Sequence, residues 1–158
     1  MSGKLKKEKR TIRNVMKLRV PSLSVNEGVV RAVVAAFCAQ LDPSANDIAD
    51  VKCVVSEAVT NCIVHGYRDT VGIIYICVTL YNDGLARIEI RDKGVGIEDV
   101  KAARQPLFTT DAGGERSGMG FTVMESFSDK ITVSSKPGKG TGVIIYKSLN
   151  GKGGADEK

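Results

Sequence analysis

Two predicted strands lie in the middle of the chain and constrain its fold most. They cover residues 73–81, an almost wholly apolar run, and residues 85–92, and the three residues Asn82-Asp83-Gly84 separate them. In the second strand apolar residues alternate with charged ones, which is typical of a strand with one buried face, and an Asp-Gly pair between two strand-like runs indicates a tight turn. The sequence therefore predicts an antiparallel β-hairpin, around which the other elements have to pack.

The remaining patterns predict an α+β chain. Further strands are predicted at residues 16–20, 131–135 and 143–147, and short helices at 97–104 and 118–127. One long helix follows Ser24, whose spacing to Glu27 is that of a capping box. A second follows Ser44 and ends at Gly66 as its C-cap. Because the strands cluster with helices between them, we expect a two-layer α/β sandwich. Its sheet would be mixed and mostly antiparallel, with helices on one face.

Length and composition exclude several classes of protein. The 158 residues fit one domain with a sizeable core, and no apolar run approaches the roughly 18 residues needed to span a bilayer. The basic start has no apolar segment behind it, so no signal peptide is expected. The four cysteines, at 38, 53, 62 and 77, form no C-x-x-C pair. They predict small buried thiols in a reducing cytoplasm, not a disulfide or zinc framework.

Positive charge is concentrated near the start of the chain. The formal net charge is +5, yet residues 1–19 carry eight Lys or Arg against one acid, and residues 20–146 carry twelve against fifteen. We therefore expect a basic, flexible arm over residues 1–14, a folded domain over 15–149 and a flexible tail over 150–158. Because the folded domain has a slightly negative net charge, we expect no direct nucleic-acid binding and no membrane binding.

The second long helix carries a carboxylate and a carboxamide, Glu57 and Asn61, four residues apart. One helical turn is about 3.6 residues, so both side chains project from nearly the same side. An apolar stripe on another side would face a core; it consists of Val51, Val55, Val59 and Ile63. Such a pair alone is common on a solvated surface. Its chemical interpretation is a Mg²⁺ ligand at Asn61 and a general base at Glu57.

Two glycine-rich stretches add to that pair. Asp92 ends a predicted strand before Gly94 and Gly96, where a carboxylate can accept a hydrogen bond from an adenine amine and glycines allow close approach. Gly118 and Gly120 stand at a predicted helix start, which is a phosphate site by its backbone N–H groups and dipole. The simpler alternatives are an Asp-initiated turn and a flexible hinge.

Taken together, Glu-x-x-x-Asn, Asp-x-Gly-x-Gly and Gly-x-Gly resemble the N, G1 and G2 boxes of the GHKL ATPase and kinase superfamily. Longer stretches resemble one family within it, the anti-sigma F serine kinases of sporulating bacteria, over about residues 16–149. These stretches are Ser56-Glu57-Ala58-Val59-Thr60-Asn61, His65-Gly66-Tyr67, Arg104-Gln105-Pro106-Leu107-Phe108-Thr109-Thr110 and Glu115-Arg116-Ser117-Gly118-Met119-Gly120-Phe121.

The resemblance implies a Bergerat-type ATP-binding fold with Glu57 as the catalytic base and Asn61 holding Mg²⁺. It implies that residues 105–117 form an ATP lid. The residues expected to contact ATP are Asn61, Asp92, Gly94, Gly96, Thr109, Arg116, Gly118, Met119, Gly120, Phe121 and Thr141. Arg31 and Arg116 would also contact protein partners.

For function, the resemblance implies a homodimeric cytoplasmic protein that inhibits sigma factor F. With ATP and Mg²⁺ it would phosphorylate a serine of an anti-anti-sigma factor. The alternative is a nucleotide-gated binding module that sequesters a partner with little or no kinase activity. A histidine kinase is disfavoured, because the only histidine, His65, lies inside the N-box helix.

Overall fold

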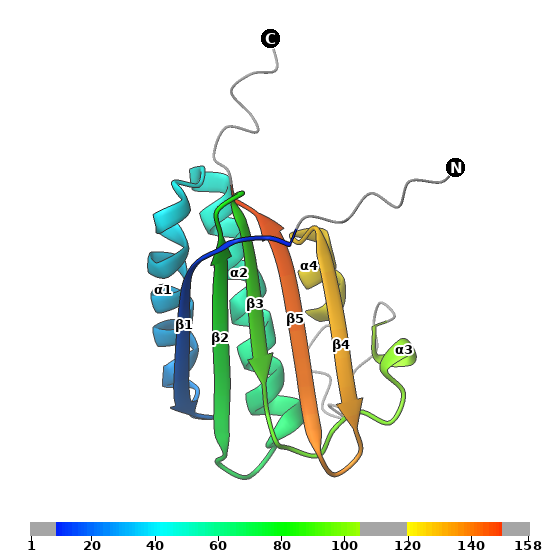
Figure 1. The fold of residues 1–158 in the computed structure, drawn as a ribbon. Coiled ribbons are helices and arrows are strands. Elements are labelled where there is room, and N and C mark those ends of the chain that lie inside the picture. Colours follow the sequence, from blue (N-terminus) through cyan, green and yellow to red (C-terminus); the bar gives the residue numbers. More distant parts are fainter. Residues whose placement is uncertain (1–8, 105–119, 150–158) are drawn as a thin grey trace, which may run out of the picture.

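The structure is a computed structural model, and it describes residues 9–104 and 120–149 (Figure 1). Its sheet has five strands, every neighbouring pair antiparallel, in the order β1-β2-β3-β5-β4. The strands are β1 (Ile12–Pro21), β2 (Ile73–Tyr81), β3 (Leu85–Arg91), β4 (Lys130–Lys136) and β5 (Gly140–Ser148).

Helices α1 (Val25–Cys38), α2 (Ala45–Asn61) and α4 (Gly120–Ser126) lie on one face of the sheet, while α3 (Val100–Ala103) stands beside the edge strand β4 (Figure 1). A short 3-10 turn at Ala39–Leu41 links α1 to α2, and a π-helical turn, Cys62–Gly66, continues α2. The predicted fold class, an α/β sandwich with helices on one face, is confirmed.

The predicted hairpin forms β2 and β3. Their register pairs Ile76 with Ile90 and Val78 with Ile88, which places these side chains on the same face. In the turn, Gly84 has a φ of 92°, and its N–H donates to the Tyr81 carbonyl at 3.0 Å. That left-handed backbone is one that glycine adopts without steric cost.

The core lies between the sheet and α1 and α2. Apolar side chains of α2, among them Val51, Val55 and Val59, are at most 1% exposed and pack with Ile76 and Ile88 of the hairpin. Full burial of each such side chain contributes about 1.5–3 kcal/mol. This packing fixes which side of α2 faces the sheet.

Several local predictions differ from the structure. Ser24 makes no side-chain cap, and Glu27 instead accepts a hydrogen bond from Ser56 on α2. The predicted cap at Ser44 is confirmed, because its hydroxyl accepts from the Asp47 N–H at 3.1 Å. Gly66 is not a left-handed C-cap, since the π-helical turn includes it. The first strand also begins at Ile12, four residues before the predicted start.

Candidate functional site

The three motifs singled out in the sequence lie on neighbouring elements of the structure. Glu57 and Asn61 are on the last turns of α2, and Gly120 is the first residue of α4. A Cβ atom placed on Gly120 would lie 3.3 Å from Glu57 Oε2 and 3.4 Å from Asn61 Oδ1. The base candidate, the metal-ligand candidate and the start of α4 therefore meet at one point.

Asp92 follows β3 directly, and its carboxylate is fixed by backbone groups of two segments. Its Oδ1 accepts from the Gly94 N–H at 2.9 Å and from the Thr141 N–H at 3.2 Å. The Asp92 N–H in turn donates to the Thr141 carbonyl at 2.9 Å. Asp92 is only 7% exposed, so these bonds supply much of the solvation that water would give.

Burial raises the pKa of the Asp92 carboxyl. Hydrogen bonds from the Gly94 N–H, the Cys62 thiol and the Thr141 N–H lower it and offset part of that rise. The same contact acts on Cys62, whose thiol pKa is raised well above its ordinary value, first by burial and then by the Asp92 charge. Cys62 is therefore a protonated hydrogen-bond donor to Asp92 and not a thiolate.

Two glycines allow the chain to approach Asp92 closely. A Cβ on Gly66, at the end of the π-helical turn, would lie 2.7 Å from Asp92 Oδ2, and a Cβ on Gly94 would lie 2.0 Å from the Gly66 carbonyl oxygen. The Val95 N–H donates to that same carbonyl at 2.9 Å. Any side chain at either glycine would push the α2 end away from the strand end.

The other side of the Asp92 loop is joined to the β4–β5 turn. Gly96 has a φ of 75°, and a Cβ there would lie 2.1 Å from the Lys136 carbonyl oxygen. The Ile97 N–H donates to Ser135 Oγ at 2.7 Å, and this hydroxyl also lies 2.8 Å from Thr141 Oγ1. The Asp92 loop is thus held between the end of α2 and the last two strands.

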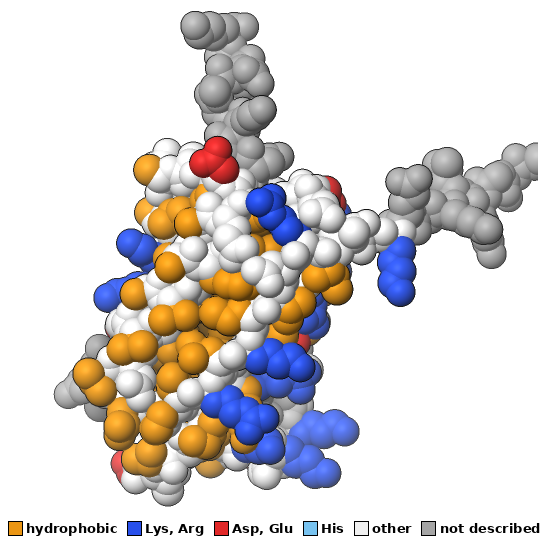
Figure 2. Space-filling view, turned by 60° about the vertical axis from the view of Figure 1, so that its left-hand side comes forward, with side chains coloured by type: hydrophobic (Ala, Val, Ile, Leu, Met, Phe, Trp, Pro, Cys, Tyr) orange, Lys and Arg blue, Asp and Glu red, His pale blue; other side chains and the backbone are white. Residues whose placement is uncertain are grey.

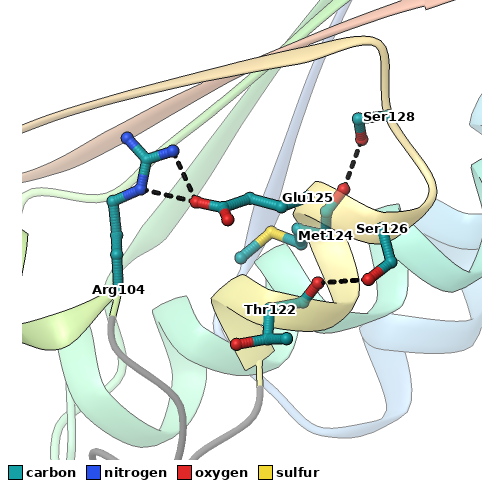
Figure 3. A network of polar contacts seen from close by, with 6 residues as sticks. All are labelled: Arg104, Thr122, Met124, Glu125, Ser126 and Ser128. Atoms are coloured by element: carbon teal, nitrogen blue, oxygen red, sulfur yellow. Dashed lines mark hydrogen bonds and ion pairs between the residues drawn. The ribbon is translucent and has the colours of Figure 1, made fainter.

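A network of polar contacts on α4 reaches back to Arg104, the last described residue before position 105 (Figure 3). Nε and Nη2 of Arg104 both donate to Glu125 Oε1, at 2.8 and 2.5 Å. The hydroxyls of Ser126 and Ser128 donate to carbonyls of the same helix, those of Thr122 and Met124. This ion pair joins the C-cap residue of α3 to helix α4.

The structure brings together Glu57, Asn61 and Gly120 at one end of the site and Asp92, Gly94, Gly96 and Thr141 at the other. Phe121 packs against the hydrophobic core. The predicted lid and four of the predicted nucleotide contacts lie outside the described residues; the contacts are Thr109, Arg116, Gly118 and Met119.

Arg31 lies on α1 and forms an ion pair with Glu27 at 3.4 Å, with its side chain 44% exposed. Glu27 also accepts a hydrogen bond from the hydroxyl of Ser56, the residue before Glu57. The predicted partner residue is therefore linked through two polar contacts to the helix that carries the base candidate.

Sequence reasoning missed the parts that Cys62, Tyr67 and Ser135 play around Asp92. The Tyr67 hydroxyl accepts from the Lys93 N–H at 2.8 Å and donates to the Ile73 carbonyl at 2.5 Å. Ser135 was detectable as a polar residue on the buried side of β4, in line with Ile131 and Val133. Nothing in the sequence around Cys62 indicates its contact with Asp92. The prediction of buried thiols holds for Cys38 and Cys62, but Cys53 is exposed.

Comparison with known proteins places this geometry in a class. Residues 20–147 match the family model described as a histidine kinase-like ATPase domain. The chain is 53% identical over 139 residues to the anti-sigma F factor of Geobacillus sp. (strain WCH70), an alignment that covers 87% of this chain and 94% of the relative. It is 54% identical over 136 residues to that of Thermoanaerobacter sp. (strain X514), with 86% and 94% covered. The chain is a histidine kinase-like ATPase domain and belongs to the anti-sigma F factor family.

Solved structures agree on the fold. The chain matches the RsbU and RsbW domains of Rv1364c from Mycobacterium tuberculosis with a TM-score of 0.61 at 18% identity, covering 87% of this chain and 33% of that one. It matches the blue-light activated histidine kinase EL346 of Erythrobacter litoralis with a TM-score of 0.56 at 18% identity, covering 78% and 42%. Across residues 9–104 and 120–149, no helix is long and apolar enough to cross a membrane.

Proposed function

We propose that this protein is an ATP- and Mg²⁺-dependent protein serine kinase that also binds and inhibits sigma factor F. The observation that carries the proposal is the meeting of Glu57, Asn61 and Gly120 at the start of α4. Phosphoryl transfer depends mainly on positioning and charge neutralisation, with a base that orients the nucleophile. The Glu57 carboxylate can act as the base and the Asn61 oxygen can hold a cation that neutralises charge. The start of α4 lies beside both side chains and can position a phosphate group.

At the other end of the site, Asp92 would receive the adenine amine. Its carboxylate is buried and fixed by backbone N–H groups, and the glycines beside it carry no Cβ. This setting suits a flat ring that donates one hydrogen bond. Gly94 and Gly96 would provide the close backbone approach, and Thr141 would hold the adenine side through its bond to Asp92.

The oxygen of Asn61 fits a Mg²⁺ ligand, because Mg²⁺ prefers oxygen and takes most of its other ligands from water and phosphate. When bound, the ion would neutralise charge on the phosphates. Glu57 would accept the proton of the substrate serine hydroxyl, and Gly120 would offer its backbone beside the phosphates. Contacts from Thr109, Arg116, Gly118, Met119 and Phe121 belong to the same proposal.

The relatives are named anti-sigma F factors, and this supports a sigma factor as the partner. The proposed place of action is the cytoplasm. We further propose a homodimer in which Arg31 and Arg116 contact the partner proteins. An anti-anti-sigma factor would supply the serine, and its unphosphorylated form would release the sigma factor. The domain would span residues 15–149, between a flexible basic arm at 1–14 and a flexible tail at 150–158.

A phosphate-transfer assay tests the proposal. The protein is incubated with γ-labelled ATP, Mg²⁺ and an extract of sporulating cells, beside an Asn61→Ala variant. One small labelled protein with wild type alone is the expected result. Nucleotide binding without any labelled protein would contradict the kinase and leave the gated binding module, in which nucleotide controls sigma-factor binding directly.

A further inference from the structure

The face of the sheet that the helices leave open carries a strong positive charge. No described helix lies over this face (Figure 1). The strand registers place side chains of all five strands in rows across it: Lys17 with Glu89, Arg19 with Arg91, and Arg87 with Lys130 through Tyr146. In Figure 2, where the open face is turned toward the right, several Lys and Arg side chains lie at the lower centre and right, beside a larger area of hydrophobic side chains.

The charges on this open face are almost all of one sign. Its cations are Lys17, Arg19, Arg87, Arg91, Lys93, Lys130 and Lys136. The one acid in these rows is Glu89. Glu89 lies in ion pairs with Arg87, at 3.0 Å, and with Arg91. Burial raises its pKa, but the hydrogen bonds and charges of Arg91 and Arg87 outweigh burial and hold the pKa low, so it stays ionised. Six positive charges therefore remain uncompensated on the described part of this face.

Tyrosines hold several of these cations in place. Arg19 Cζ and Lys93 Nζ lie 5.2 and 5.0 Å from the centre of the Tyr75 ring, and Lys130 Nζ lies 5.8 Å from that of Tyr146. Cation–π contacts of this kind limit the freedom of long side chains before any ligand arrives. A set of ordered cations across a broad face is an electrostatic footprint for a polyanion.

We propose that the open sheet face binds the phosphate backbone of a nucleic acid without sequence preference. The excess of positive charge on the open face is the observation that favours a polyanion as its ligand. The sequence analysis predicted no nucleic-acid binding, but that prediction rested on the net charge of residues 20–146 as a whole. That sum left out Lys17 and Arg19, which lie in β1, and it averaged over two faces that differ in charge.

Other occupants fit less well. A second copy of the same face would bring like charges together, and residues 150–158 carry two cations and two acids, so they have no net charge to offer. An acidic protein segment would be expected to find an apolar anchor at the centre of its interface. The central row instead presents Lys17, Cys77, Glu89 and Thr132, with Ile144 its one aliphatic side chain. The exposed aliphatic side chains Val15 and Ile73 lie on the edge strand β1 and at the start of β2, away from the centre of the face.

The test measures fluorescence anisotropy of a labelled mixed-sequence oligonucleotide, single-stranded and duplex, with the full chain between about 50 and 200 mM salt. Affinity should fall steeply with salt, by about 0.7 to 0.9 logarithmic units per decade for each phosphate contacted. The double variant Lys17→Glu, Arg19→Glu should bind at least tenfold more weakly, with a slope shallower by about 1 to 2.

The matched control is Lys52→Glu, Lys101→Glu, which makes the same charge change at exposed positions on α2 and α3. It should keep wild-type affinity. A second face variant, Lys130→Glu, Lys136→Glu, lies on the opposite edge strand and can replace the first variant if that one does not fold. Thermal unfolding shows whether each variant is folded.

Three outcomes would overturn the proposal. They are no binding by wild type at the lowest salt, equal weakening by the control and the face variants, and tighter binding of a poly-glutamate peptide or of anionic lipid vesicles through the same lysines and arginines. The last outcome would assign the open face to an acidic protein or to a membrane surface. None of them bears on ATP binding, so the kinase proposal is tested separately.

Discussion

At the Asp92 end of the site, backbone groups meet at distances that leave no room for a side chain, whereas at the Glu57 end the nearest glycine keeps a wider separation. A Cβ on Gly94 would lie 2.0 Å from a carbonyl oxygen, but a Cβ on Gly120 would come no closer than 3.3 Å to the Glu57 carboxylate. One end is thus shaped by the main chain and the other by side-chain chemistry. Substitutions at the two ends should fail in different ways.

The largest effect is expected at the side-chain end. Glu57→Gln keeps the size of the residue and removes the base, so the rate of phosphate transfer should fall by about 10²- to 10⁴-fold. The free energy of unfolding should stay within about 0.5 kcal/mol of wild type. Glu98→Gln, the same change at an exposed loop position, is the control. A Glu57→Gln enzyme with the wild-type transfer rate would remove Glu57 from the mechanism.

Gly94→Ala should show the reverse pattern. Its Cβ would overlap the Gly66 carbonyl, so the strand end and the π-helical turn must separate, at a cost of about 2–4 kcal/mol of unfolding free energy. Gly120→Ala adds the same methyl group in a wider space, so it should lower the unfolding free energy by less than about 1 kcal/mol. Denaturant unfolding of both variants checks this. Equal destabilisation would show that the two ends do not differ as described.

Asp92→Asn separates binding from stability at the main-chain end. The amide can still accept from the Gly94 and Thr141 N–H groups, but it offers an adenine amine no charge. ATP affinity should fall about 10- to 100-fold, as for the loss of a hydrogen bond to a charged group. Equilibrium binding of a fluorescent ATP analogue measures it. Unchanged affinity would mean that adenine does not contact Asp92.

The same variant gives a pH dependence. Burial raises the folded-state pKa of Asp92 above its ordinary value of 3.8, so the folded protein binds a proton more readily than the unfolded chain. The contribution of Asp92 to stability is then fully present below that value and is lost as the pH rises through the folded-state pKa. Relative to wild type, Asp92→Asn should therefore gain stability across this range. If the unfolding free energies of wild type and Asp92→Asn changed in parallel with pH, the pKa of Asp92 would not be raised in the folded protein.

The smallest effect is expected at the Arg104–Glu125 pair. Both side chains are about one-third or more exposed, so Glu125→Gln should cost only about 0.2–1 kcal/mol of unfolding free energy. Because the pair joins the two helices on either side of residues 105–119, a loss of ATP affinity should accompany the substitution if those residues contact ATP. Arg10→Gln, which breaks an exposed pair with Asp83, is the comparison.

The sequence was informative where chemistry is carried by side chains. The placement of Glu57 and Asn61 on one helix was predictable from the sequence, and β2 covers the predicted residues 73–81. Gly66 was assigned a wrong role because a glycine after a helix usually signals a C-cap, whereas here it makes room for Asp92. Close backbone approach between distant segments leaves no local pattern. The charge of the open face was hidden for a similar reason, since register alone brings Lys17, Arg87 and Lys130 onto one surface.

The antiparallel order of the strands has a practical consequence. The start of β1 and the end of β5 lie at the end of the sheet that carries the β2–β3 turn, opposite the end of β3 that leads into the Asp92 loop (Figure 1). The Leu149 N–H is fixed to the Gly84 carbonyl in the β2–β3 turn at 2.7 Å. A fluorophore or surface tether attached near either position would therefore leave the nucleotide loops facing solution, and single molecules could be immobilised with their candidate site accessible.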